Sequence, residues 1–130
     1  MTPLLPPGWL RPKGYSNGIS ATGRLIVTAG VVGWDEREYF VSRELPGQFA
    51  QVLRNIVAIL AEGGARPEHL VRLTCYVTSI EDYLGALQEI GASWKEILGA
   101  HYPAIALVQV ERLVDPSAKV EIEATAVVPE

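Results

Sequence analysis

Two glutamates near the end of the chain, Glu121 and Glu123, have the spacing of groups that could transfer protons. They alternate with apolar, mostly β-branched residues over 120–126, which predicts a strand whose side chains switch faces at every residue. Both carboxylates would therefore lie on one face, opposite the apolar residues. A general acid or base is the functional interpretation of such a carboxylate. The alternative is a solvated strand residue, or one paired with Arg72 or Lys119 of a neighbouring strand.

The apolar run just before this strand supplies the second half of the candidate site. Its two alternating sets separate Ile105, Leu107 and Gln109 from Ala106, Val108 and Val110. We expect the first set on the same sheet face as Glu121, where Ile105 and Leu107 would exclude water from the carboxyl group. That face would also hold Arg72, Thr74 and Tyr76. Since it is too apolar for bare solvent, we expect a second subunit to cover it.

The remaining elements follow from periodicity and turn residues. The chain predicts, in order, a short strand at 15–20, a strand at 25–32, a helix from Pro46 to Gly63, a strand at 70–78 and a helix from Ser79 to Gly99. The nearly continuous apolar run at 25–32 indicates a strand buried on both faces. Ser79 and the acid three residues later resemble a capping box. The order is β-β-α-β-α-β-β, an α+β fold in which right-handed crossovers place both helices on one sheet face.

Length and charge limit the class of protein. The chain of 130 residues predicts one domain, 15–130, preceded by an irregular, proline-rich arm over 1–14. A net charge of −4 without a Lys/Arg cluster argues against a nucleic-acid partner. No apolar run is long enough to span a membrane, and the N-terminus lacks the pattern of a signal peptide. The single cysteine, Cys75, cannot form an internal disulfide, so we expect a cytoplasmic protein.

Metal and phosphate-binding patterns are weak in this sequence. His69 and His101 flank turns and have no acidic or cysteine partners at ligand spacing, so we predict no metal site. Residues 29–33 lack the spacing of a phosphate-binding glycine loop. Cys75 lies among apolar residues and is predicted to be a small buried side chain. The candidate chemistry therefore centres on acid–base groups.

Five segments together resemble the RidA/YjgF family. They are Gly14-Tyr15-Ser16-Asn17-Gly18, Thr28-Ala29-Gly30, Gln51 with Asn55-Ile56, Tyr102-Pro103-Ala104, and Val120-Glu121-Ile122-Glu123-Ala124. The likeness covers residues 14–128. It implies a chorismate mutase-like fold, a mixed sheet backed by two helices, in a homotrimer with sites in the clefts between subunits. It also implies hydrolysis of reactive enamines and imines to a keto acid and ammonia, with no metal or organic cofactor.

The family's site residues can be placed on this sequence one by one. Its cleft tyrosine corresponds to Tyr15, its first-strand glycine to Gly30, and its water-positioning glutamate to Glu121 rather than Glu123. Interface packing is the alternative for Tyr15. The arginine that holds the substrate carboxylate corresponds to Ile105. A charged hydrogen bond contributes about 1.5–3 kcal/mol, so losing two should weaken binding of an amino-acid imine by about a hundredfold or more.

Further lining residues are expected around these positions. Val31 and Trp34 follow the glycine on the strand that lines family clefts. Trp34 would stack on an aromatic ligand or, as the alternative, cap a subunit interface. Ile105 and Leu107 would line an apolar part of the cleft, which favours a small-molecule metabolite that is less charged or more hydrophobic than an ordinary amino-acid imine.

Two functions compete at this point. The first is a RidA-like hydrolytic deaminase acting on a small, relatively apolar enamine or imine at an intersubunit cleft, distinct from a general 2-aminoacrylate deaminase. The second is a catalytically silent RidA-fold protein that binds a metabolite or a protein partner. Loss of the arginine favours the silent protein, and the sequence places neither Arg72 nor Arg43 as a substitute cation. Retention of Tyr15, Gly30 and Glu121 favours the enzyme, which is the leading hypothesis.

Overall fold

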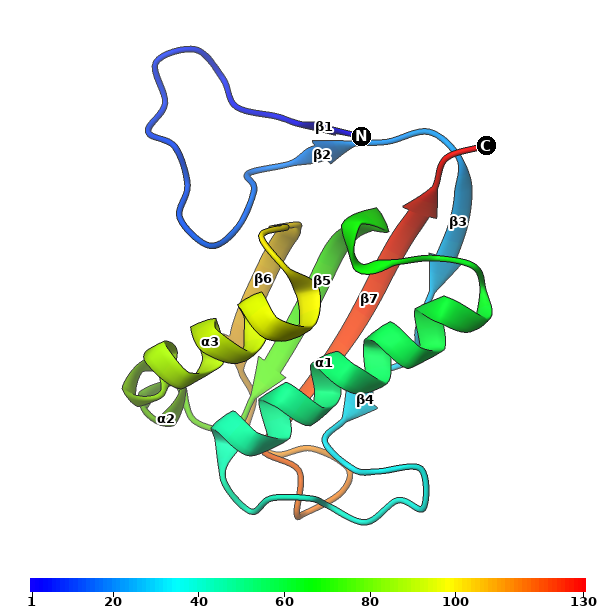
Figure 1. The fold of residues 1–130 in the computed structure, drawn as a ribbon. Coiled ribbons are helices and arrows are strands. Elements are labelled where there is room, and N and C mark those ends of the chain that lie inside the picture. Colours follow the sequence, from blue (N-terminus) through cyan, green and yellow to red (C-terminus); the bar gives the residue numbers. More distant parts are fainter.

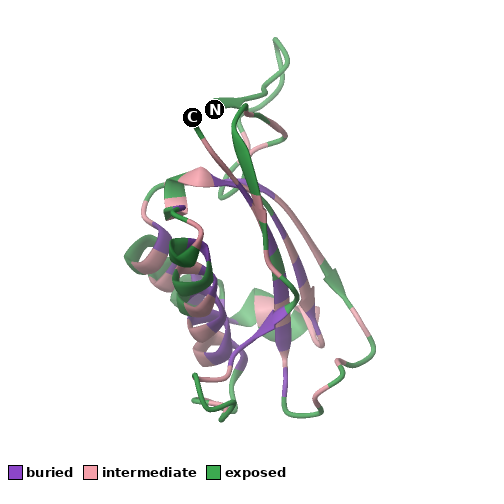
Figure 2. Ribbon diagram, turned by 90° about the vertical axis from the view of Figure 1, so that its right-hand side faces the viewer, coloured by how far each residue is buried: buried purple, intermediate pink, exposed green.

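Two layers make up the fold, a mixed β-sheet and a layer of helices on one of its faces (Figure 1, Figure 2). The computed structural model describes all residues, 1–130. Across the sheet the strands lie in the order β3 (Arg24–Val27), β7 (Val120–Val128), β5 (Leu70–Val77) and β6 (Ala104–Gln109), and β4 (Val31–Val32) also pairs with β7. Strand β6 runs parallel to β5, and the other pairs are antiparallel. The predicted α+β fold with a mixed sheet is confirmed.

Helix α1 (Leu45–Glu62) forms where the sequence predicts a helix. Pro46 lies in its first turn, and Gly63 follows its last residue. Its apolar residues recur every three or four positions and are buried against the sheet: Phe49, Val52, Leu53, Ile56 and Leu60. Burial of this stripe makes α1 the largest helical contribution to the core.

The second predicted helix is two helices in the structure, α2 (Ile80–Gly85) and α3 (Leu87–Leu98). Ser79 caps the first of them, since its side-chain oxygen accepts a hydrogen bond from the Asp82 backbone N–H at 3.1 Å. The break comes at Ala86, where φ is −116° and ψ is 14°. Gly85 lies just before the break, and glycine is a poor helix former because its backbone loses the most freedom on folding. All three helices cover the same face of the sheet (Figure 2).

The strand predicted at 25–32 is interrupted. Strand β3 ends at Val27 and β4 begins at Val31, and their registers against β7 differ by one residue. Thr28 stabilises the interruption, because its hydroxyl oxygen accepts a hydrogen bond from the Ala124 backbone N–H at 3.0 Å. One extra residue opposite a continuous partner strand is a β-bulge, a feature that bends the strand locally.

The sheet face away from the helices is uncovered in the single chain. It holds the residues that alternation places there: Arg72, Thr74, Tyr76, Glu121 and Glu123. Leu25 and Val27 of β3 also lie on this face and are 65% and 64% exposed. The prediction that this strand is buried on both faces is therefore wrong for β3 in one chain, since nothing within the chain packs over it.

The prediction that Ile105 and Leu107 of β6 share a sheet face with Glu121 is wrong within one chain. The parallel register pairs Ile105 with Leu73 and Leu107 with Cys75, and both partners are buried under the helices. Ile105 and Leu107 therefore face the helices, whereas Glu121 faces away from them. Alternation could not reveal this, because both sets of residues on β6 are mostly apolar. Pairing with β5 decides which set faces inward.

Gln109, at the end of β6, is predicted from the sequence on the same face as Glu121, and this prediction is also wrong. Gln109 pairs with Val77, which is buried on the helical side. Its side-chain oxygen accepts a hydrogen bond from the Ile80 backbone N–H at 2.8 Å. Gln109 thus satisfies a free donor at the start of α2 and does not lie on the face that holds the glutamates.

The N-terminal arm forms an open loop that projects from the rest of the fold and is closed at its base by a short pair of strands (Figure 1). Strand β1 (Thr2–Pro3) pairs with β2 (Ile19–Ser20), so the strand predicted at 15–20 is limited to its last two residues. Ser16 makes a single parallel bridge with Ala104 at the start of β6. This bridge holds the base of the arm beside the edge of the sheet.

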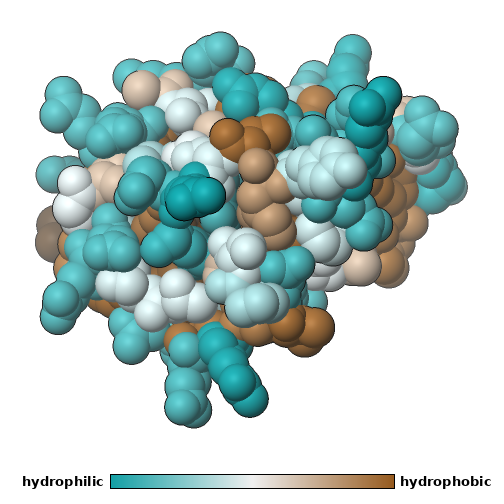
Figure 3. Space-filling model, turned by 90° about the horizontal axis from the view of Figure 1, so that it is seen from below, coloured by the Kyte–Doolittle hydropathy of each residue, from teal (hydrophilic) through white to brown (hydrophobic).

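The remaining surface is mixed in character. A short 3-10 helix, η1 (Pro67–His69), leads into β5. Viewed from below, the surface is mainly hydrophilic, with smaller apolar areas between the polar side chains (Figure 3). None of the helices combines the length and the hydrophobicity needed to cross a lipid bilayer.

Candidate functional site

Glu121 lies on the uncovered sheet face, with Val32 of β4 and Tyr76 of β5 as its register partners. Gly30, in the bulge between β3 and β4, lies directly against it. A Cβ built on Gly30 would overlap with the Glu121 carboxylate, so a larger residue there would have to displace the glutamate. The structure therefore brings together the predicted glutamate and the predicted glycine, and the bulge is what brings them together.

Tyr76 adds to this cluster a phenol that sequence reasoning does not assign to the site. Its hydroxyl donates a hydrogen bond to Glu123 Oε1 at 3.1 Å across the β5–β7 pair. This hydrogen bond, followed by desolvation and by the negative charges of Glu123 and Glu121, raises the pKa of Tyr76 above its ordinary value. The phenol therefore stays protonated at neutral pH and remains a hydrogen-bond donor. The signal that could have found it is its place opposite Glu121, which depends on strand register.

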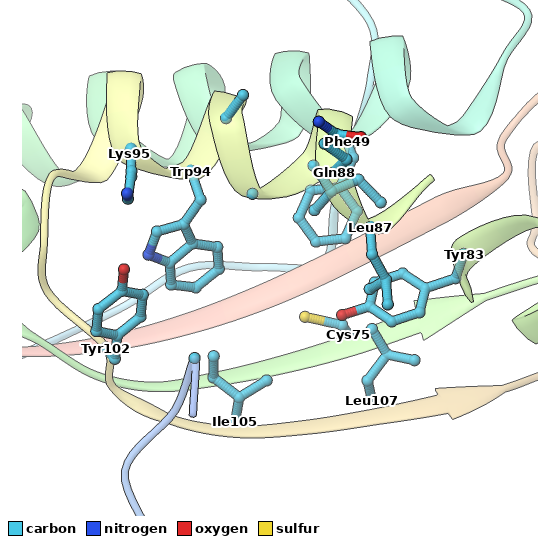
Figure 4. Close-up of a pocket in the computed structure, with 14 residues that line it drawn as sticks. Phe49, Cys75, Tyr83, Leu87, Gln88, Trp94, Lys95, Tyr102, Ile105 and Leu107 are labelled. Atoms are coloured by element: carbon cyan, nitrogen blue, oxygen red, sulfur yellow. The ribbon is translucent and has the colours of Figure 1, made fainter. Parts of the chain in front are cut away.

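Ile105 and Leu107 line a different space, a cavity of about 530 Å³ between α3 and the strands β5 and β6 (Figure 4). Its lining is mainly apolar and aromatic and includes Phe49, Tyr83, Leu87, Ile90, Trp94 and Tyr102. The rings of Trp94 and Tyr102 are stacked, with centroids 6.2 Å apart and planes at 8°. The Trp94 Nε1–H donates a hydrogen bond to the His101 carbonyl at 3.0 Å, which fixes one wall of the cavity.

Tyr15 lies in neither of these places. Its side chain is 44% exposed and lines a hollow of about 540 Å³ that is formed largely by the N-terminal arm. The Ser16 backbone N–H donates a hydrogen bond to the Pro103 carbonyl at 3.0 Å, which fixes the segment beside the start of β6. Tyr15 is therefore near the strand that holds Ile105, and Glu121 does not line its hollow.

Val31 and Trp34 line a third hollow, of about 430 Å³, together with Gly30 and residues of α1. Asn55 of α1 holds this segment in place, because its side-chain N–H donates a hydrogen bond to the Trp34 carbonyl at 2.7 Å. Gly30, at the bulge, lines this hollow and also lies against the Glu121 carboxylate. Gly30, Val31 and Trp34, which the sequence predicts as lining residues, therefore line one hollow.

Within one chain, Glu121 and Ile105 lie on opposite faces of the sheet, so a single copy does not place them in one hollow. The parallel register of β6 is the physical reason. Neither Arg72 nor Arg43 lines the cavity that holds Ile105, and therefore neither replaces the family arginine there. No group of three or more His, Cys, Asp or Glu side chains is arranged to hold a metal ion.

Cys75 is the buried residue that the sequence predicts. It is 1% exposed and lies among the apolar residues below α3. Burial raises the pKa of its thiol to about 12, because an apolar environment disfavours the thiolate. The sulfur at the cavity wall is therefore a neutral, unreactive group at physiological pH.

We expect Cys75 to resist alkylation in the folded protein. With a pKa of about 12, roughly one thiol in ten thousand is ionised at pH 8, and the thiolate is the form that reacts. Labelling with iodoacetamide at pH 8, followed by mass spectrometry, should therefore be slow in buffer and complete in urea. The folded-state rate should rise with pH. Equal labelling rates in buffer and in urea would contradict the burial of this side chain.

Comparisons with known proteins converge on one family. A family profile described as "Endoribonuclease L-PSP" matches residues 10–128. The 2-iminobutanoate/2-iminopropanoate deaminase of Salmonella typhimurium is 28% identical over 116 residues, covering 87% of this chain and 86% of that protein. A RutC family protein of Pyrococcus abyssi is 33% identical over 113 residues, covering 86% of this chain and 84% of that protein. The solved structure of YyfB from Yersinia pestis, a Rid family protein of unknown function, matches with a TM-score of 0.81 at 32% identity, covering 96% of this chain and 97% of that chain.

Proposed function

The chain belongs to the RidA/YjgF family, and from this premise we propose that it is a hydrolytic deaminase of a small, relatively apolar enamine or imine. An imine deaminase role is established in the family by relatives that are named 2-iminobutanoate/2-iminopropanoate deaminase. The observation that supports the proposal best is the Glu121 carboxylate held against Gly30, beside the Tyr76 phenol. The carboxylate is a proton acceptor, and it lies next to a backbone position where any side chain would displace it.

The proposed reaction needs only water as a second reactant. An enamine first tautomerises to the imine. Water then adds to the imine carbon, and Glu121 accepts a proton from the water and returns it to the nitrogen. The addition gives a carbinolamine, and Glu121 next transfers the proton of the carbinolamine hydroxyl group to the nitrogen. The carbon–nitrogen bond then breaks, ammonia leaves, and the carbonyl product remains. No electron is gained or lost, so no oxidant or reductant is required.

We propose that the complete site forms between copies of the chain in a homotrimer. Ile105 and Glu121 lie on opposite faces of one sheet, so one copy would supply the apolar cavity and another would supply the glutamate. The exposed apolar side chains on the uncovered face support this proposal. Leu25 and Val27 are each more than half exposed there, as is typical of a surface that another protein chain covers.

The proposal is tested by measuring ammonia release from a panel of imines that an amino-acid oxidase generates in the assay. We expect turnover of imines with apolar side chains and little or none of freshly generated 2-aminoacrylate, since the small substrate would contact little of the apolar lining around Ile105. Absence of ammonia release from every imine would favour the alternative, a silent protein that binds a metabolite. The absence of the arginine is the observation that favours this alternative.

Restoring the arginine provides a more direct test of the apolar position. Ile105→Arg should raise the turnover of 2-aminoacrylate by about tenfold or more, because the guanidinium can pair with its carboxylate. The side chain already lines a cavity, so the longer residue has space to extend. Ile105→Gln, which adds length without charge, is the matched control and should show no gain. An unchanged rate in a correctly assembled Ile105→Arg protein would mean that this cleft serves another ligand.

Gly30→Ala should reduce activity without unfolding the protein. The added Cβ overlaps with the end of the Glu121 side chain, which is flexible and can move aside. We expect ammonia release to fall by about tenfold to a hundredfold, since a displacement of about 1 Å in a catalytic group has effects of this size. The melting temperature should change by less than about 3 °C. Gly85→Ala, where nothing lies within 4 Å of the new Cβ, is the control and should keep full activity.

A further inference from the structure

We propose that Lys95 binds the carboxylate of the substrate in the cavity below α3, and that this substrate carries an apolar side chain of aromatic size. The inference rests on the proposed function and names its substrate class, an imine of a large apolar amino acid. Lys95, on α3, would supply the positive charge that Ile105 cannot supply.

The charge of the cavity favours an anion. Within one chain, Lys95 is the only charged residue that lines it, and no carboxylate of the same chain does. Lys95 forms no ion pair, since the single ion pair in the structure joins Arg66 and Glu68. Its side chain is exposed at the rim of the cavity and points toward the Tyr102 hydroxyl (Figure 4). A ligand carboxylate at this end would meet an ammonium group and a phenol that can donate a hydrogen bond.

The remainder of the cavity fits an apolar body. A volume of about 530 Å³ lies within the range of small-molecule sites. Phe49, Ile105 and Leu107 provide apolar surface, and the stacked rings of Trp94 and Tyr102 form a flat wall. A phenyl or indole group would bury much more apolar surface here than a methyl group would. The imines of small amino acids would leave most of this space empty.

The cavity also explains how a family member without the arginine could still hold a carboxylate. Lys95 lies on α3, in the helical layer that covers β6. Its ammonium group would therefore hold the carboxylate nearer to the helices than an arginine at position 105 of β6 could. The space between Lys95 and the apolar residues of β6, which form the floor of the cavity, is then available to the side chain of the substrate. Replacement of the arginine by Ile105 thus enlarges the apolar floor, while the cation is supplied from above.

Binding of a matched series of stable acids tests the proposal without requiring turnover. The series is 3-phenylpropanoate, its neutral amide 3-phenylpropanamide, and propanoate, each titrated into the full-length protein by calorimetry. We expect saturable binding of 3-phenylpropanoate and at least about tenfold weaker binding of the other two, because each lacks either the charge or the aromatic body. Lys95→Met should weaken 3-phenylpropanoate by about tenfold and leave the amide unchanged. Lys95→Arg should restore binding.

Arg54→Met is the control variant, since Arg54 is exposed on α1 and lines none of the three hollows. It removes the same charge and should bind 3-phenylpropanoate as the wild type does. Equal affinity of Lys95→Met and wild type, or equal affinity for the acid and the amide, would overturn the assignment of Lys95. If the acids bind as expected but the imine of phenylalanine yields no ammonia, the binding site stands and the proposed deaminase function fails.

Discussion

Replacing Gln48 with leucine should lower the free energy of unfolding by about 3–6 kcal/mol. Gln48 lies on α1 and is 0% exposed. Its side-chain N–H groups donate hydrogen bonds to the carbonyls of Ser42 at 3.1 Å and Ser117 at 2.9 Å, and its oxygen accepts one from the Lys119 backbone N–H at 2.8 Å. Leucine has a similar volume and makes none of these bonds. Three backbone groups would then lose their partners, at about 1–3 kcal/mol for each one that stays buried.

Urea unfolding is the measurement, with equal m values required for the comparison. Gln88→Leu is the control, since Gln88 is exposed on α3 and its side chain forms no hydrogen bond within the chain. It should change the free energy by less than about 0.5 kcal/mol. The effect is expected to be large because Gln48 joins the loop before α1 to the loop before β7. A Gln48→Leu protein within about 1 kcal/mol of wild type would show that these loops do not depend on it.

The largest effect on activity is expected for Glu121→Gln, which should lower kcat by about a hundredfold or more. The amide has the size of the carboxylate and can keep its place against Gly30, but it cannot accept a proton. General acid–base catalysis contributes about a hundredfold to ten-thousandfold, so removal of the proton acceptor should have an effect in this range. Ammonia release by the purified, assembled protein is the measurement, with the best apolar imine of the panel as substrate.

Glu123→Gln is the matched control for this prediction. Glu123 is on the same strand face, and its amide oxygen could still accept the hydrogen bond from Tyr76. We expect its kcat to stay within about tenfold of wild type, since it does not lie against Gly30. Robust activity of the Glu121→Gln protein would remove Glu121 from the proposed mechanism. Equal losses in both variants would assign the acid–base role to the pair and not to Glu121.

Several elements could be predicted from local sequence because each has an unambiguous pattern. Pro46 and Gly63 mark the ends of α1, and the apolar stripe between them has helical spacing. In β5 and β7 apolar residues alternate with polar or charged ones, so the buried face of each strand follows from the sequence. The family resemblance, confirmed by the comparisons, identified the glycine and the glutamate that contact each other.

Other features depend on contacts between distant parts of the chain. The face of β6 is set by its parallel register with β5, because apolar residues occupy both of its alternating sets. The interruption after β3 arises from a one-residue shift against β7, which an apolar run from 25 to 32 does not encode. Both features change the site, since the first turns Ile105 toward the helices and the second places Gly30 against Glu121.

The sequence by itself determined the α+β class and the family, because these depend on local patterns and on the order of short motifs. The tertiary structure alone decided that Ile105 and Glu121 lie on opposite faces, and that Lys95 and Trp94 share a cavity with Ile105. The physical reason is that side-chain neighbours across a sheet or between layers are fixed by strand register and helix packing. These long-range contacts have no signal in the residues of any one segment.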